Sequence, residues 1–446
     1  MKLTIPQGYW DQLQQSVRTD GVETVVIALA TLAHTPTSQR LLLRELRFPA
    51  DGDYAYRGAT GAQVTPRFVA ETVADARRLQ LSCVFIHTHP LALEARFSQV
   101  DDAGERVLAK FLSQRVPDRT HVAVVVTPHH SCARILGTNV PIDVTIVGAI
   151  VRQELATPER EHSTSAGPSL DNYDRQVRAL GRDAQRRLQS LTIAIVGLGG
   201  TGSVAAQQLA HLGVRDFVLV DPDTLDRTNL NRVVGANATR IGRPKVDVAA
   251  DHLKDISADV RCTILQDNIV HNSILATLVD VDAIFCCTDS HGSRYVLNEL
   301  AYRYLIPCFD VGVAIVVSDR VTHISGRAQL LSPGLPCLTC QGTLDPSAVR
   351  RDLMSDSERA RDPYIIGAHV PEPAVISINS TVVSLATTMF LATFARLPSL
   401  ARHIRYDGIA CTVRPTTSAI HPGCVTCSPQ GAYAWGDSWP LPGRPS

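Results

Sequence analysis

Residues 1–152 alternate short apolar runs with segments of helical periodicity. The apolar runs include VETVVIALATLA, RLLLRELRF, SCVFIHTH and HVAVVVTP. Each is bounded by polar residues and is rich in Val, Ile and Leu, which is typical of buried strands. Segments 66–80 and 102–113 space their apolar residues as amphipathic helices do. We therefore predict an α/β domain over residues 1–152.

The pattern changes after this region. The polar, charged segment RQELATPEREHSTSAGPSLDN predicts a linker over 153–170. LTIAIVGLGGTGS, VAAQQLAHLG and DFVLVD then give a strand, a Gly-rich turn, a helix and a strand. This order predicts that a parallel, Rossmann-like α/β domain begins after about Tyr173. Residues 429–446 are rich in Gly, Pro and Trp, and we expect a mobile tail there.

Segment 374–395 is apolar and long enough to span a membrane, but it contains Asn379 and several Ser and Thr residues. We interpret it as a buried helix and expect no membrane partner. The N-terminus shows no basic start followed by an apolar core, so no signal peptide is expected. The 446 residues include 43 basic and 43 acidic side chains, and this zero net charge argues against nucleic acid as a partner.

Cysteine usage indicates the cytoplasm and a metal site. The chain has 11 cysteines, an odd number that does not suit a disulfide framework. Two C-x-x-C pairs stand out, Cys337 with Cys340 and Cys424 with Cys427. Four thiolates in two such pairs are typical of a closed, tetrahedral structural zinc site without a catalytic role.

The Gly-rich turn predicts a nucleotide site. It supplies four glycines between a strand and a helix: Gly197, Gly199, Gly200 and Gly202. Glycines there let phosphates approach the backbone at the helix N-terminus. Asp221 ends the next predicted strand, where a carboxylate can bind ribose hydroxyls. Taken alone, this arrangement would also suit a nicotinamide-dependent dehydrogenase.

The residues that follow favour another class. In order, the chain carries YDRQ, the Gly-rich turn, D-x-D-x-x-x-x-x-N-x-x-R, G-x-P-K and T-D-S. Together these motifs resemble the adenylation domain of the ubiquitin-activating enzyme family, which includes the bacterial ThiF and MoeB proteins. The resemblance covers about residues 171–428.

The resemblance implies a role for each matching residue. Asp221 would hold the ribose of ATP, and Asp289 would hold magnesium. Asn229, Arg232 and Lys245 would contact the phosphates. Arg175 would reach the ATP of a second subunit, which implies a homodimer. Family members that form a thioester carry a cysteine after the first C-x-x-C, but residues 341–373 contain none, so we expect adenylation without a thioester on this chain.

The predicted N-terminal domain carries a second motif. His87 and His89 are two apart on a predicted strand, so their side chains point to one side and can share a metal. Asp101 can complete three ligands and leave a fourth position to water, as in catalytic zinc sites. The pattern H-x-H-P, seven residues, S-x-x-D resembles the JAMM (MPN-type) metalloprotease motif.

This second resemblance implies an α/β metalloprotease domain. Ser98 would stabilise the oxyanion or orient the water, and an upstream glutamate would hold the zinc-bound water and move its proton. Glu23 and Glu45 are the candidates for that glutamate. Glu23 fits better because it precedes an apolar strand, although Thr24 and Val25 depart from the usual E-x-G-G context.

The two resemblances lead to one functional hypothesis. The chain would adenylate the C-terminus of a ubiquitin-like protein and would cleave that protein with zinc, with a conjugating-enzyme-like protein as a possible further partner. One alternative is activation of a sulfur carrier for cofactor biosynthesis, with trimming of its precursor. Another is an adenylating enzyme whose N-terminal domain is an inactive binding module.

Overall fold

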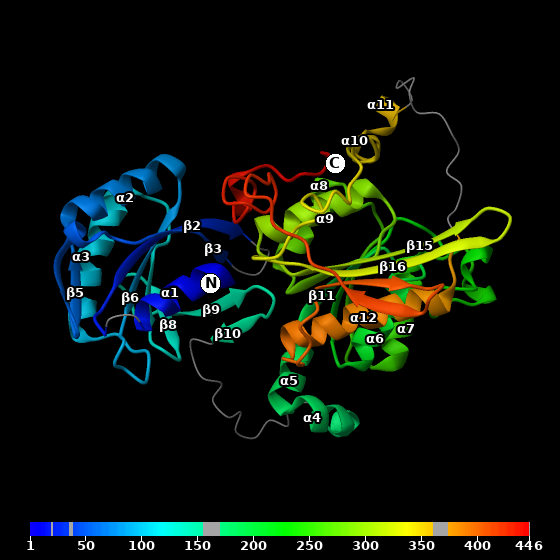
Figure 1. Ribbon diagram of the computed structural model, residues 1–446, viewed down its shortest axis with the longest axis horizontal. Helices are drawn as coiled ribbons and strands as arrows, with labels where there is room; N and C mark the ends of the chain where they lie inside the picture. The colour runs from blue at the N-terminus through cyan, green and yellow to red at the C-terminus, as the bar shows by residue number, and fades with distance from the viewer. Residues whose placement is uncertain (19–20, 35–38, 155–169, 360–372, 446) are drawn as a thin grey trace. The chain divides into compact units, whose positions relative to one another are not determined.

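The computed structural model describes residues 1–18, 21–34, 39–154, 170–359 and 373–445. Within them the chain forms two compact units of mixed α/β structure (Figure 1). Unit 1 consists of Met1–Gly167 with two short segments, Arg303–Leu305 and Pro429–Pro440. Unit 2 consists of Pro168–Tyr302, Ile306–Ser428 and Leu441–Ser446. Most of the predicted linker, residues 155–169, lies outside the described residues.

Unit 1 is built on one eight-stranded sheet in the order β1-β3-β2-β6-β7-β8-β9-β10. Because β1 also pairs with β9, the sheet closes on itself. The pair β6–β7 is parallel, while β6 is antiparallel to β2. The main elements are β1 (Lys2–Pro6), α1 (Gln7–Arg18), β2 (Val25–His34), β3 (Gln39–Arg47), β4 (Tyr54–Gly58), β5 (Gly61–Val64), α2 (Pro66–Leu79), β6 (Ser82–Thr88), α3 (Gln99–Arg115), β7 (Val122–Val126), β8 (Ser131–Ile135), β9 (Pro141–Val147) and β10 (Arg152–Glu154).

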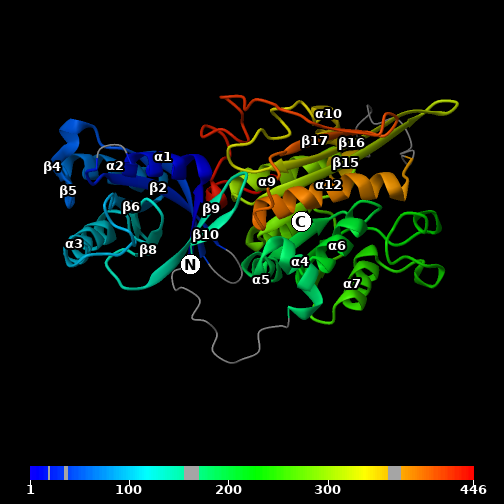
Figure 2. The ribbon, with the colours of Figure 1, turned by 60° about the horizontal axis from the view of Figure 1, so that its bottom comes forward.

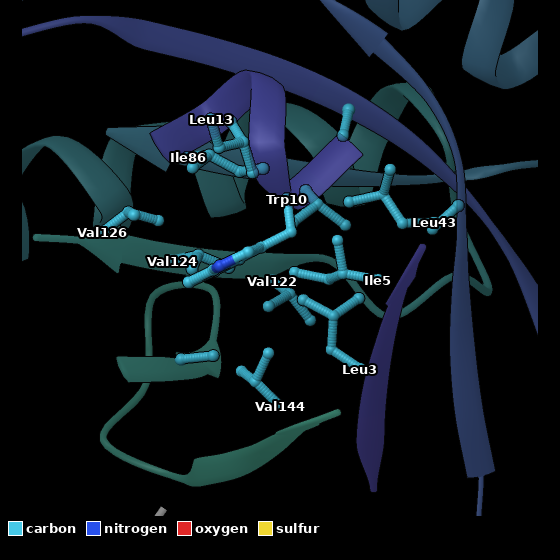
Figure 3. Packing of buried hydrophobic residues seen from close by; sticks show 14 of the residues in the cluster. Leu3, Ile5, Trp10, Leu13, Leu43, Ile86, Val122, Val124, Val126 and Val144 are labelled. Atoms are coloured by element: carbon cyan, nitrogen blue, oxygen red, sulfur yellow. The ribbon is translucent and has the colours of Figure 1, made fainter. Parts of the chain in front are cut away.

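Alternation along β2 explains why this strand is apolar on both faces. Val26, Ala28 and Ala30 face a core that contains Trp10 and Leu13 of α1, part of which Figure 3 shows. The residues between them, Ile27 and Leu29, face a second core beneath α2 and α3. Side chains of a strand point alternately to its two faces, so a central strand covered on both sides reads as a continuous apolar run.

Unit 2 is built on a second eight-stranded sheet in the order β13-β12-β11-β14-β15-β16-β17-β18. From β13 to β15 neighbouring strands are parallel, and from β15 to β18 they are antiparallel. The main elements are α4 (Asp174–Leu180), α5 (Arg182–Ser190), β11 (Thr192–Val196), α6 (Gly202–His211), β12 (Asp216–Val220), α7 (Lys245–Ile256), β13 (Arg261–Leu265), α8 (Asn272–Leu275), β14 (Ala283–Cys286), α9 (His291–Arg303), β15 (Cys308–Val317), β16 (Val321–Leu331), α10 (Pro346–Leu353), α11 (Asp356–Arg359), α12 (Ile376–Phe394), β17 (His403–Asp407) and β18 (Thr412–Pro415).

Helix α12 matches the apolar segment predicted as a buried helix. It is the one described helix whose length and composition would allow a membrane span, yet half of its most apolar window is buried. It packs against β15, β16 and α6 (Figure 2). Asn379, Thr387 and Thr393 are buried within it. Thr387 donates a hydrogen bond of 2.8 Å to Gln208 of α6, so a polar side chain of α12 has a partner inside the unit.

The segment after Cys427 differs from the mobile tail expected there. Pro429–Pro440 is part of unit 1, and its Ala432 and Ala434 are fully buried. Thr31 of β2 donates to the carbonyl of Ala434 at 2.6 Å. The indole of Trp435 lies 3.7 Å beneath the Arg44 guanidinium and adds to the core under α2 and α3. A composition rich in Gly, Pro and Trp therefore marks a packed irregular segment here.

We predict that Trp435→Ala destabilises unit 1 by about 3 kcal/mol, because it removes a large side chain from a core contact and from the Arg44 stack. Thermal or urea unfolding would measure this loss. Trp439→Ala is the matched control, since Trp439 stacks on Trp435 but is 39% exposed. Equal stability of the Trp435→Ala variant and the unsubstituted chain would show that the segment adds little to the unit.

Candidate functional site

A pocket of about 490 Å³ opens at the carboxyl ends of the parallel strands of unit 2. Gly197 directly follows β11 with a φ of +86°, and a Cβ there would lie 2.8 Å from the Cys287 carbonyl oxygen. A Cβ on Gly202 would lie 1.7 Å from the Gly197 carbonyl oxygen. Glycine is therefore required at both positions for α6 to begin so close to the strands. Gly199 and Gly200 also line the pocket.

Asp221 is fixed at the end of β12. It is buried, and its two carboxylate oxygens accept the N–H groups of Leu198 at 2.6 Å and Asp223 at 2.9 Å. Burial raises the pKa of Asp221. The Lys245 ammonium, 3.9 Å away, and the two N–H groups lower this pKa, but the effect of burial is larger. Lys245 also lies 2.6 Å from a carboxylate oxygen of Asp223. This geometry places the Asp221 carboxylate and the Lys245 ammonium together beside the Gly-rich turn.

Four of the predicted site residues outside the turn line the pocket: Asp221, Arg232, Lys245 and Asp289. Asn229 is buried near the pocket, where its amide oxygen accepts the Asp226 N–H at 3.0 Å and closes a short turn. Asn229 does not belong to the described lining, so its contact with phosphates stays a prediction. Arg175 is exposed on α4, also away from this lining.

The charges around the pocket suit a nucleotide held with a divalent cation. The described lining of the pocket contains four carboxylates and three cations. The carboxylates are Asp221, Asp223, Asp267 and Asp289, and the cations are Arg232, Lys245 and Arg294. A triphosphate adds further negative charge, which a magnesium ion bound by carboxylate oxygens would offset. Magnesium therefore fits the residues present, with the exposed Asp289 as the predicted ligand.

An ion network that no sequence motif predicts lies beneath this pocket. Asp310 of β15 is fully buried and pairs with Arg294 of α9 and with Arg327 of β16, whose Nη2 lies 2.6 Å away. Arg294 also donates to the carbonyl oxygens of Thr288, at 2.7 Å, and Val311, at 3.1 Å. Arg294 thus shapes the loop that carries Asp289. The only signal in the sequence is its position five residues after Asp289.

The four predicted zinc cysteines are brought together in unit 2. The ligand atoms of Cys337, Cys340, Cys424 and Cys427 all lie within 4.8 Å of one another. The Sγ atoms of Cys337 and Cys424 are 3.5 Å apart, as are those of Cys340 and Cys427. Hydrogen bonds with neighbouring thiols lower the pKa of Cys337, the contact with Cys427 having the largest effect, and this favours a thiolate. Four convergent sulfur atoms form a zinc-binding cluster of the closed, structural kind.

Unit 1 brings its three predicted metal ligands together. The ligand atoms of His87, His89 and Asp101 lie within 4.8 Å of one another. His87 is on β6 and His89 directly follows it, and their rings are 4.9 Å apart on the same side, as strand alternation predicts. Nε2 of His87 is buried 3.2 Å from Oδ1 of Asp101 but makes no hydrogen bond. A buried imidazole nitrogen that makes no hydrogen bond and faces a carboxylate is well placed to bind a metal.

The start of α3 fixes Asp101. Ser98 is the N-cap, and its hydroxyl oxygen accepts the Asp101 N–H at 3.2 Å. In return, Oδ2 of Asp101 accepts the Ser98 N–H at 2.6 Å, which leaves Oδ1 toward His87. Burial raises the pKa of Asp101, but the contacts with His87 and Ser98 outweigh this and lower it overall. The role predicted for Ser98 in stabilising an oxyanion stays a prediction.

The structure separates the two glutamate candidates. Glu23 precedes β2, and its Oε1 lies 3.9 Å from Nε2 of His89. Burial raises the pKa of Glu23, while His87 lowers it. Glu45 instead pairs with Arg47 at 2.8 Å, and its side chain is 47% exposed. Glu23 is therefore the glutamate that reaches the histidine pair.

The chain matches the ThiF family over residues 173–424. This match covers more than half of the chain, which therefore belongs to the ThiF family. The molybdopterin-synthase adenylyltransferase of Escherichia coli is 27% identical over 57% of this chain and 95% of its own length. The SAMP-activating enzyme E1 of Haloferax volcanii is 30% identical over 38% of this chain and 61% of its own length. A crystal structure of E. coli MccB with ATP is 19% identical, with a TM-score of 0.46 over 58% of this chain and 74% of that one.

We predict that Cys424→Ser removes one equivalent of zinc per chain and lowers the melting temperature of unit 2, because a structural zinc site adds directly to folding stability. Zinc content by mass spectrometry and calorimetric melting would measure both. Cys411→Ser is the matched control, since Cys411 is an exposed free cysteine of the same unit. An unchanged zinc content in Cys424→Ser would contradict a four-thiolate site.

Proposed function

We propose that unit 2 uses ATP to adenylate the C-terminal carboxylate of a ubiquitin-like or sulfur-carrier protein. Membership of the ThiF family, joined to the pocket that gathers the Gly-rich turn, Asp221, Arg232, Lys245 and Asp289, is the observation that carries this proposal. The names of two relatives, a molybdopterin-synthase adenylyltransferase and a SAMP-activating enzyme E1, support the same activity. We also propose that the enzyme acts in the cytoplasm, without membrane or nucleic-acid partners.

The proposed reaction is a displacement at phosphorus. A carboxylate oxygen of the partner protein forms a bond to the α-phosphorus of ATP, the bond from that phosphorus to the bridging oxygen breaks, and pyrophosphate leaves. Arg232 and Lys245 would stabilise the charge that develops on phosphate oxygens. Asp221 would hold the ribose, Asp289 would hold magnesium, and magnesium would neutralise phosphate charge when bound. No cysteine lies in 341–373, so we propose that no thioester forms on this chain.

We further propose that two chains form a homodimer. Arg175 is exposed on α4 and does not line the pocket within the described part of its own chain. An exposed arginine next to the start of the family match can serve the nucleotide pocket of a second copy. A conjugating-enzyme-like protein would be a further partner only if the adenylate is passed on to conjugation.

For unit 1 we propose zinc-dependent cleavage of a peptide or isopeptide bond after the same ubiquitin-like protein. His87, His89 and Asp101 would hold zinc and leave a fourth position to water. When bound, zinc would lower the pKa of that water toward neutrality. Glu23, beside His89, would accept the proton of the water and later give it to the leaving amine. Ser98 would orient the water or stabilise the oxyanion.

Arg232→Ala is predicted to lower ATP–pyrophosphate exchange by about 100-fold or more, because it removes a donor to charged phosphate oxygens. The assay would use purified ubiquitin-like and sulfur-carrier proteins from the same genome. Arg227→Ala is the matched control, since Arg227 is exposed on the same loop and does not belong to the described pocket lining. Background exchange with every carrier tested would refute the adenylation proposal.

Glu23→Gln is predicted to lower cleavage of a ubiquitin-like protein carrying a C-terminal extension by about 100-fold or more while zinc stays bound, because the amide cannot accept a proton. Cleavage would be followed by mass spectrometry. Glu45→Gln is the matched control and should cleave normally. If the unsubstituted chain binds the carrier but cleaves no extension, unit 1 is a binding module. Full activity of Glu23→Gln would refute its role in proton transfer.

A further inference from the structure

Arg134 of β8 contacts the residues around the metal cluster of unit 1 on two sides. We propose that Arg134 is a positioning residue that holds the side chains of His87 and Asp101 where both can bind the same zinc ion. This inference rests on the zinc site proposed for unit 1. The JAMM motif that this chain resembles does not include this arginine, which lies more than 30 residues after Asp101 in the chain.

On one side, Arg134 cross-links β8 to the first two turns of α3. Its Nη2 lies 2.6 Å from Oδ1 of Asp102 and 2.8 Å from Oε1 of Glu105, while Nε lies 3.1 Å from Oε2 of Glu105. Asp102 is the neighbour of the ligand Asp101, and Glu105 follows one turn later on the same helix. The guanidinium therefore fixes the axial position and rotation of the helix end that presents the Asp101 carboxylate.

On the other side, Arg134 stacks on an aromatic ring. Its guanidinium carbon lies 3.8 Å from the centre of the Phe97 ring. That ring meets His87 edge to face, with 6.3 Å between the ring centres. Phe97 directly precedes Ser98, the N-cap of α3. Arg134 therefore supports His87 through the Phe97 ring and supports Asp101 through the start of α3.

The burial of these groups makes the arginine difficult to replace. Arg134 is 8% exposed and Glu105 is 6% exposed, and Glu105 also accepts the Gly137 N–H at 3.2 Å. Loss of the guanidinium would leave a buried carboxylate without its cation, and either protonation of Glu105 or movement of α3 would relieve this; both loosen the link between β8 and α3. Lysine offers a point charge without the planar fork and the stacking surface, so it would replace only part of the function.

The experiment measures zinc binding by the full-length chain in buffers of graded free zinc, with bound zinc counted by mass spectrometry. His87→Ala identifies the zinc held by unit 1, because the four-cysteine site stays intact in that variant. We expect Arg134→Met to lower the zinc affinity of the unit 1 site by 10- to 100-fold, as is usual when a residue supporting metal ligands is lost. Zinc bound by the four cysteines should not change.

Two further variants keep the result interpretable. Arg134→Lys preserves the charge and is expected to bind zinc with an affinity between those of Arg134→Met and the unsubstituted chain, which keeps the test valid if Arg134→Met does not fold. Arg47→Met is the matched control, because Arg47 pairs with Glu45 and Asp75 in the same unit and touches no residue of the cluster in any described contact. Arg47→Met should have a lower melting temperature than the unsubstituted chain but the same zinc affinity.

The outcomes separate this inference from the proposed function. Zinc affinity within twofold of the unsubstituted chain in folded Arg134→Met and Arg134→Lys would overturn the positioning role. Equal weakening in Arg47→Met would also overturn it, because any lost ion pair of unit 1 would then have the same effect. If His87→Ala removes no zinc, the proposed metal site itself fails.

Discussion

The candidate sites of both units depend on one constraint of parallel β-structure. The carboxyl ends of parallel strands meet at one edge of the sheet, where the chain must leave the ladder and its backbone groups need new partners. In unit 2 the ends of β11, β12 and β14 expose the Gly-rich turn, Asp221 and the loop with Asp289 at one edge. In unit 1 the parallel pair β6–β7 ends at the two histidines, and His89 donates its N–H to the Val126 carbonyl at 2.9 Å.

The polar groups beneath these edges determine how precisely the side chains are placed. Asp310 ties Arg294 and Arg327 together where the sheet of unit 2 changes from parallel to antiparallel pairing. Arg134 does the same for unit 1, where it connects β8 to α3. Buried ion pairs of this kind add little net stability compared with apolar packing, but they define a single geometry. Such a geometry matters most where several charged side chains must converge on one ligand.

The parts of the structure that depend on local pattern could be predicted from the sequence. Strand alternation predicted that His87 and His89 share one side, the helical pattern of 102–113 matches most of α3, and the Gly-rich turn predicted a site where the pocket of unit 2 lies. Features that depend on distant packing could not be predicted. Arg134 is a lone arginine on a short strand, and no local pattern shows that it meets Phe97 and Glu105. The segment around Trp435 resembles a loose tail in composition, because its partners on β2 and β3 lie about 400 residues earlier in the chain.

The two candidate metal sites differ in a way that limits what each can do. The cysteine cluster of unit 2 offers four sulfur atoms, which fill a tetrahedral shell and leave no place for a reacting water. The cluster of unit 1 offers three ligands, and the buried Nε2 of His87 makes no hydrogen bond. The carboxylate of Glu23, whose pKa is raised by burial, lies beside this cluster. Only an incomplete shell can bind water and keep a base within reach of it. The zinc-dependent hydrolysis proposed for this chain therefore suits the cluster of unit 1 and not the cysteine cluster, and the ATP chemistry proposed for unit 2 would rely on the cations of its pocket and on magnesium.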